Sequence, residues 1–360
     1  MRAKAFLATL ALVLMLAGCS EPPPPEQETV REQQQPAPER AAESSLVTTT
    51  RTALCNNVTA LNESVSALVQ TPQKDRLTAA RDNWKAAHLS WRQWDLLKAL
   101  AQPETSRKDS LFHPLDAHPL LPGYLDRVPG YPASGLVYSE VPLTLAYLRD
   151  RHQSTDPYYV TRGFHALEFM LWGPLDDTDA SPTRDAAAFH PDSSDHQGLP
   201  DKQRRAHLLE LISRDLEATL APQCPPNSPP DWSTSLTQHL ETAEGQERSL
   251  VHWFRLELLP AVRQWQQYPE GEDRNGMPLW HSAFARSDLQ EWGSLMRWGN
   301  DSLWPQAGAG EQRATLAETL ASITSREGPT GEQISTLLAQ LERLVEALSP
   351  QAENTSEKAG

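Results

Sequence analysis

The stretch TRGFHALEFMLWG, residues 161–173, decides how the whole sequence is interpreted. Apolar residues recur here at helical spacing and predict a face turned to a core: Val160, Phe164, Leu167 and Leu171. His165 and Glu168 are three residues apart, so in a helix they lie one turn apart on one face and can reach the same point. We expect this helix to begin at Asp156-Pro157, a capping residue followed by a first-turn proline, and to end at Gly173.

The His165–Glu168 pair has the composition of a metal site. An imidazole nitrogen and a carboxylate oxygen that project together suit zinc or iron, and ferritin-like bundles use Glu and His at this spacing. A bare pair at this spacing also occurs on ordinary helix surfaces and in satisfied cores, so a structural role stays open. Gly163 costs about 1 kcal/mol relative to alanine inside a helix, which indicates a neighbour packed closely against the backbone.

Helical patterns continue on both sides of this stretch, and no segment alternates for long enough to predict a sheet. Apolar residues from Leu54 to Leu68 recur at steps of three and four and predict a helix of about 22 residues. The other predicted helices span 74–100, 142–151, 200–220, 233–268, 279–298, 313–324 and 332–348. The sequence therefore predicts an all-α fold: a helical domain over 48–348 in two packed bundle halves, about 48–175 and 199–348, and a disordered tail at 349–360.

Residues 102–142 are rich in proline and glycine and are expected to form an ordered connection. Four aromatic residues are expected to hold it against the bundle: Phe112, Tyr124, Tyr131 and Tyr138. Six tryptophans at helical spacing could form a ligand platform, but core packing is the preferred interpretation: Trp84, Trp91, Trp94, Trp253, Trp292 and Trp298.

The charge balance and the missing motifs exclude several function classes. The 360 residues include 47 acidic and 32 basic side chains, a net charge of -15. This is the wrong sign for neutralising phosphate, so no nucleic-acid partner is expected. The sequence contains no GxSxG motif, no Walker loop and no dinucleotide fingerprint.

The N-terminus has the pattern of a lipoprotein signal peptide over residues 1–18. Arg2 and Lys4 precede an apolar stretch that ends in Leu16-Ala17-Gly18-Cys19, with Cys19 as the lipid acceptor. An ordinary secretory peptide is the alternative. Residues 19–47, rich in Pro, Glu and Gln, predict a disordered tether. Ser20 follows the cysteine, which is similar to lipoproteins of the Gram-negative outer membrane. We expect a protein facing the periplasm or the cell surface that contacts the membrane only through its lipid.

Two further cysteines remain, Cys55 and Cys224. In an oxidising compartment an isolated pair can bond, and we hypothesise a disulfide between them. The bridge would close a loop of about 170 residues and contribute up to about 5 kcal/mol in the chain-entropy model. Two separate buried thiols are the alternative.

The string around Gly163, His165 and Glu168 closely resembles the GxHxxE signature of the imelysin family, also called insulin-cleaving membrane proteases. The resemblance is strong around His165 and looser over residues 48–345. It implies an all-helical fold of two bundle-like halves, a surface or periplasmic location and an association with iron acquisition. It also implies a metallopeptidase class, which rests largely on the motif.

The same resemblance makes a late element, Ser282 to Asp288, look like the family's second motif. Ala283 stands where many members have His, so a metal ligand common elsewhere is missing. Neither HExxH nor its inverted form is present, because Phe169 occupies the position of the second His. Further ligands must come from elsewhere, and the candidates are His88, His113, Asp116, His118, His281 and Asp288. The proline-bounded loop HPLDAH, residues 113–118, is interpreted as merely polar.

Three function classes follow. The first is a non-enzymatic protein that binds a divalent metal, Fe or Zn, or an iron-linked ligand at His165 and Glu168. It would serve iron acquisition together with iron-uptake partner proteins. The second is a metallopeptidase completed by distant ligands, whose catalytic residues the sequence does not identify. The third is an interaction scaffold in which the motif is structural.

Overall fold

The computed structural model describes residues 38–102, 113–174, 183–191, 200–224, 230–267, 289–323 and 330–349. The chain divides into two units, Met1–Pro38 and Glu39–Gly360, and the elements described here belong to the second, apart from Pro38. The predicted signal peptide, Cys19, Phe112, His281, the element from Ser282 to Asp288 and the tail after residue 349 lie outside the described residues.

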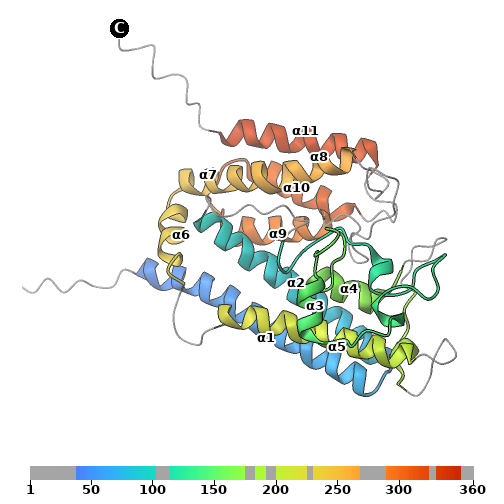
Figure 1. Ribbon diagram of the computed structural model, residues 1–360. Helices are drawn as coiled ribbons and strands as arrows, with labels where there is room; N and C mark the ends of the chain where they lie inside the picture. The colour runs from blue at the N-terminus through green and yellow to red at the C-terminus, as the bar shows by residue number, and fades with distance from the viewer. Residues whose placement is uncertain are drawn as a thin grey trace, which may run out of the picture. The chain divides into compact units, whose positions relative to one another are not determined.

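The described ranges consist of helices and turns, without a strand, and an isolated bridge pairs Val128 with Tyr131 (Figure 1). The prediction of an all-α fold is confirmed. In chain order the α-helices are α1 (Pro38–Gln70), α2 (Lys74–Ala101), α3 (Leu145–Arg151), α4 (Phe164–Trp172), α5 (Asp201–Leu220), α6 (Ser233–Leu240), α7 (Ala243–Trp253), α8 (Leu259–Gln267), α9 (Leu289–Ser302), α10 (Gly310–Ser322) and α11 (Gly331–Leu348). Short 3-10 helices are η2 (Pro122–Tyr124), η3 (Leu136–Tyr138), η4 (Ala186–Phe189) and η5 (Ala221–Gln223), and η6 (Phe254–Leu258) is a π-helix between α7 and α8.

Helices α1, α2, α4 and α5 pack together in one group. α4 contacts both α2 and α5, and the side chain of Asn62 on α1 accepts a hydrogen bond from Ser213 on α5 at 3.0 Å. A disulfide joins Cys55 on α1 to Cys224 after η5, with an S–S length of 2.01 Å across 169 residues. α5, which the sequence places in the second predicted half, therefore packs with the first group of helices.

A second group consists of α6 to α11, in which α9 packs on α10 and α11 packs on α8 (Figure 1). Helix α2 contacts α6, α7 and α9 of this group as well as α4, so it carries side chains into both. The tryptophans of α2 are core residues: Trp84, Trp91 and Trp94 are all buried. Trp253 and Trp292 are buried in the second group, and Trp298 packs against the core, as the sequence predicts.

Three helix boundaries differ from the predictions. α1 begins at Pro38, inside the predicted tether, since a proline fits the first turn and no proline follows until after the helix. α4 begins at Phe164 instead of near Asp156, because the Asp156 carboxylate accepts the backbone N–H of Tyr158 at 2.8 Å and forms a turn. The helix expected over 233–268 is interrupted at Thr242, whose hydroxyl accepts the Gly245 N–H and starts α7.

The connection between α2 and α3 is ordered where it is described, from residue 113 onward. Tyr138 is buried and Tyr124 stacks on Tyr159 at a centroid distance of 4.1 Å. Tyr131 does not hold the connection, since it is 69 % exposed beside the turn at Gly130.

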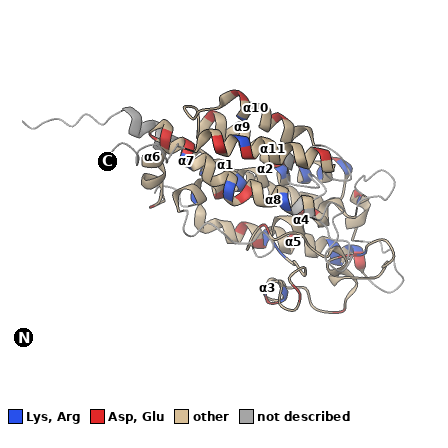
Figure 2. Ribbon diagram, turned by 90° about the horizontal axis from the view of Figure 1, so that it is seen from above, with Lys and Arg blue, Asp and Glu red and all other residues tan. Residues whose placement is uncertain are grey.

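Acidic and basic positions are interspersed along the helices instead of gathering on one element (Figure 2). Within the described part of the chain, no helix has both the length and the apolar character to cross a membrane.

Candidate metal centre

The start of α4 is fixed by Gly163 and by the loop at residues 113–118, which lies in the connection after α2. Gly163 has φ of 88°, and a Cβ there would lie 2.5 Å from the carbonyl oxygen of Leu115. That carbonyl accepts the N–H of Phe164 at 2.7 Å, and the Trp84 indole donates to the Phe164 carbonyl at 2.9 Å. Only glycine combines this positive φ with so close an approach. The close neighbour expected at Gly163 is therefore present, although Gly163 precedes the helix instead of lying within it.

This contact brings Asp116 beside His165. The backbone N–H groups of Leu115 and Asp116 donate to Nδ1 of His113 at 3.3 and 3.0 Å, which shapes the loop. His118 lies on the other side of Asp116, with its Nδ1 2.7 Å from the Asp116 carbonyl and its ring 4.6 Å from that of His165. The two histidines of the loop thus position Asp116.

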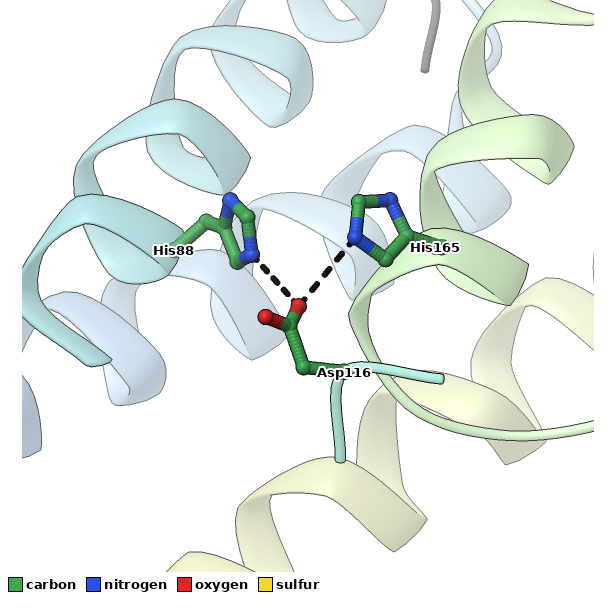
Figure 3. A group of neighbouring side chains, drawn as sticks. All are labelled: His88, Asp116 and His165. Carbon is green, nitrogen blue, oxygen red and sulfur yellow. Dashed lines mark hydrogen bonds and ion pairs between the residues drawn. The ribbon is translucent and has the colours of Figure 1, made fainter. Parts of the chain in front are cut away.

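Two imidazoles converge on the carboxylate of Asp116 (Figure 3). Nε2 of His88, from α2, lies 2.6 Å from Oδ1 of Asp116, and Nε2 of His165, from α4, lies 3.2 Å from the same oxygen. One ligand atom from each of the three residues lies within 4.8 Å of the others. All three side chains are buried, at 4 % exposure or less. We call His88, Asp116 and His165 the His–Asp–His cluster.

A second carboxylate contacts Nδ1 of each imidazole, the ring nitrogen that does not face Asp116. Nδ1 of His165 lies 2.9 Å from Oε2 of Glu168, and Nδ1 of His88 lies 2.8 Å from Oε1 of Glu291 on α9. Glu168 and Glu291 are buried as well. Metal-binding histidines typically donate their second N–H to a carboxylate, which fixes the ring and leaves the other nitrogen for the ion.

Burial and the carboxylates act in opposite directions on these groups. Burial opposes the charged imidazole of His88, but Glu291 and Asp116 outweigh it and raise the pKa of His88 to about 10. Burial is likewise outweighed at His165, where Asp116 and Glu168 raise the pKa well above its usual value. The pKa of Asp116, which burial alone would raise, is held well below its usual range by His88 and His165. The carboxylates therefore favour positive charge on both imidazoles.

The cluster fits a divalent ion in geometry and in charge. The buried Nε2 of His165 faces Oδ1 of Asp116 at 3.2 Å, so an ion that replaced its proton would meet the same carboxylate. Two nitrogens and a carboxylate oxygen form a donor set that zinc and iron accept. A divalent ion in place of two imidazolium protons leaves the formal charge of the cluster unchanged.

Comparison with known proteins identifies a family. The family model described as imelysin matches residues 48–222, a range that contains His88, Asp116, His165 and Glu168. Residues 48–222 belong to the imelysin family. No curated protein matches the chain.

In this imelysin the residues singled out from sequence take different places. His165 contributes to the cluster, whereas Glu168 contacts the far side of the His165 ring, so the two do not face one point as the spacing suggested. His88 and Asp116, two of the further candidates, supply the facing atoms. The loop interpreted as merely polar thus provides a cluster residue, while His113 and His118 support it.

Sequence reasoning missed Glu291 and Arg92. Glu291 comes from α9, beyond the range matched by the imelysin family model, and an isolated glutamate in a helix carries no recognisable signal. Arg92 lies one turn after His88 on α2, and this i, i+4 spacing was the available clue. Its guanidinium lies 3.2 Å from Oδ2 of Asp116 and 3.8 Å from Oε2 of Glu291.

Proposed function

We propose that this imelysin binds one divalent transition-metal ion at the His–Asp–His cluster, with Glu168 and Glu291 orienting the two histidines. The observation that carries the proposal is that each imidazole faces Asp116 through Nε2 and a second carboxylate through Nδ1. Metal-binding histidines typically direct one ring nitrogen to the ion and the other to a carboxylate, and both imidazoles have this arrangement around Asp116.

We further propose that the protein is anchored to the outer membrane through Cys19, faces the periplasm or the surface, and supplies iron to uptake partners. The lipobox at residues 16–19 supports the anchor. Support for iron comes from the donor set, because imidazole with carboxylate accepts iron as well as zinc.

A metallopeptidase is the second candidate, favoured by the peptidase designation of the family model. A catalytic metal needs three protein ligands, an open position and a carboxylate free to act as base. The cluster supplies three ligands, but its side chains are buried, and Glu168 is engaged by His165. These features favour binding over hydrolysis.

Parallel titration of the full chain with Fe(II), Zn(II) and Cu(II) tests the proposal. We expect one ion per chain in the wild type and a loss of at least about 100-fold in affinity for His165→Gln and His88→Gln, since each removes one ligand. His239→Gln, at an exposed position of α6, is the matched control and should bind as the wild type. Equal affinity in all variants would refute the site.

The same preparations distinguish the peptidase. Cleavage of an unstructured peptide that a chelator abolishes, and that His165→Gln also abolishes, would establish hydrolysis at the cluster. Cleavage that is equal in wild type and variant would come from a contaminant.

A further inference from the structure

Exposure increases in one direction through the charged network around the cluster. The side chains of His165 and Asp116 are 0 % and 4 % exposed, that of Arg92 is 16 % exposed, and that of Glu257 is 28 % exposed. These residues are in sequential contact: His165 with Asp116 at 3.2 Å, Asp116 with Arg92 at 3.2 Å, and Arg92 with Glu257 at 3.8 Å. Among these described residues, Arg92 therefore lies between the buried cluster and the more exposed Glu257.

The guanidinium of Arg92 is shared by three carboxylates. Nη1 faces Oδ2 of Asp116, Nη2 faces Oε2 of Glu257, and Nε faces Oε2 of Glu291. Asp116 thus presents Oδ1 to the imidazoles and Oδ2 to the guanidinium. A cation that approaches from this side meets a fixed positive charge immediately before the cluster.

Glu257 is held in place by an irregularity of the backbone. It lies in the π-helix η6, whose Phe254 and Leu258 are buried, and its Oε2 accepts the indole N–H of Trp253 at 3.1 Å. The wider turn of a π-helix changes the direction of the side chains that follow, and such insertions recur at functional sites. The result is a positioned, partly exposed carboxylate beside Arg92.

We propose that Arg92 gates the metal centre and that Glu257 is the outer carboxylate toward which Arg92 moves when the centre opens. In the closed state Arg92 pairs with Asp116. In the open state its guanidinium moves toward Glu257, so that it keeps a carboxylate partner while the ion passes to Asp116. This inference rests on the proposed metal binding and assigns the route and the residues that control it.

The rate constants and the Kd of metal binding distinguish a residue that gates the site from a residue that binds the ion. A residue that only controls the route changes the association and dissociation rate constants by the same factor and leaves Kd unchanged. A ligand or its support changes Kd. Stopped-flow mixing of the full chain with Co(II) gives the association rate, and displacement by excess chelator gives the dissociation rate.

The decisive variant is Glu257→Gln, which removes the charge that stabilises the open state and keeps the shape. We expect both rate constants to fall by about tenfold, since a less populated open state limits both steps, with Kd within about twofold of the wild type. Glu342→Gln is the control, because Glu342 also pairs with an arginine, Arg263, at 3.5 Å on an exposed surface. It should leave both rates unchanged.

Arg92→Lys is the second variant. It keeps the charge but cannot span three carboxylates, so both rate constants should rise. Unchanged rates in Glu257→Gln with intact equilibrium binding would overturn the gate alone, as would an altered Kd at an unchanged association rate. Absence of binding by the wild type would overturn the proposed function and the gate with it.

Discussion

Asp116 and Asp126 are buried aspartates that each lie between two cationic side chains, and their networks differ in what those cations can do. Asp116 lies between His88 and His165 at 2.6 and 3.2 Å. Asp126, further along the same connection, lies between Arg184 and Arg205, both at 2.6 Å from its Oδ2. A guanidinium stays charged and has no lone pair, whereas an imidazole can exchange its proton for a metal. The arginine network can only hold the chain together.

The surroundings of the two networks agree with this difference. Arg205 donates in addition to the Ala188 carbonyl and the Tyr138 hydroxyl, so it fastens η4 and η3 to α5. The histidines instead have a second carboxylate behind each ring. The first network joins structural elements, and the second is arranged around one point.

The largest effect on stability is predicted for a substitution in the arginine network. Asp126→Asn removes the carboxylate that Arg184 and Arg205 share, leaves Arg205 only the carboxylate of Asp201 at 3.7 Å, and should lower the free energy of unfolding by about 3–5 kcal/mol. Asp116→Asn should cost less, because the imidazoles can lose their protons and the guanidinium groups cannot. Urea denaturation of both variants at neutral pH measures the difference. Equal losses would mean that the two networks are both purely structural.

The next largest effect is the stabilisation by bound metal, which should differ between the two networks. A metal present at 100 times its Kd should raise the free energy of unfolding of the wild type by about 2.7 kcal/mol. Asp116→Asn should lose this increase, while Asp126→Asn, from its lower baseline, should keep it. The measurement is the shift of the denaturation midpoint with and without the ion. A shift retained in Asp116→Asn would place the ion elsewhere.

The carboxylates behind the rings give a smaller effect. Glu168→Gln keeps a hydrogen-bond acceptor for His165 but removes the charge, and it should weaken metal binding by about 10- to 100-fold. Glu210→Gln, in an exposed pair with Arg214 on α5, is the control. Titration with Zn(II) measures both. An abolished site would instead indicate that Glu168 binds the ion directly.

The smallest effect concerns His152, a histidine whose pKa is lowered instead of raised. Burial, with Arg162 beside it, lowers the pKa of His152 to about 4. Because the unfolded state then binds more protons between about pH 6.5 and pH 4, stability should fall as pH falls through this range. In the described structure Nε2 of His152 is buried without a hydrogen-bond partner, which agrees with a neutral ring.

The corresponding variant is His152→Gln. We expect the wild type to lose about 2 kcal/mol more than the variant between pH 7 and pH 5, measured by urea denaturation. The control is His239→Gln, at an exposed position of α6, which should lose as much stability as the wild type over this pH range. A loss of the same size in the wild type and in His152→Gln would assign the pH dependence to other groups.

The sequence predicted the helices well where the apolar period was regular, as in α2, α5 and α11. The predicted helix boundaries were wrong where a single residue decided them. Asp156 and Thr242 act through side-chain hydrogen bonds, and Gly163 through its close approach to Leu115. Local hydrogen bonds of this kind compete with helix formation and do not change the periodicity of the sequence.

For the site, the i, i+3 pair located His165 and Glu168 but not their roles. Which face of the His165 ring meets Asp116 depends on the contact between Gly163 and Leu115, which joins segments far apart in the chain. The partner of His88, Glu291, comes from the other helical group through α9. These are tertiary contacts, and the spacing within one helix contains no information about them.

The most direct test of the central claim is an anomalous difference map from a crystal grown with one equivalent of Zn(II) or Fe(II), collected at the metal edge. We expect a single strong peak between Nε2 of His88, Nε2 of His165 and Oδ1 of Asp116, with Glu168 and Glu291 remaining on the Nδ1 atoms. A peak coordinated by Glu168 in place of Asp116, or an ordered cluster with no peak among its side chains, would contradict it.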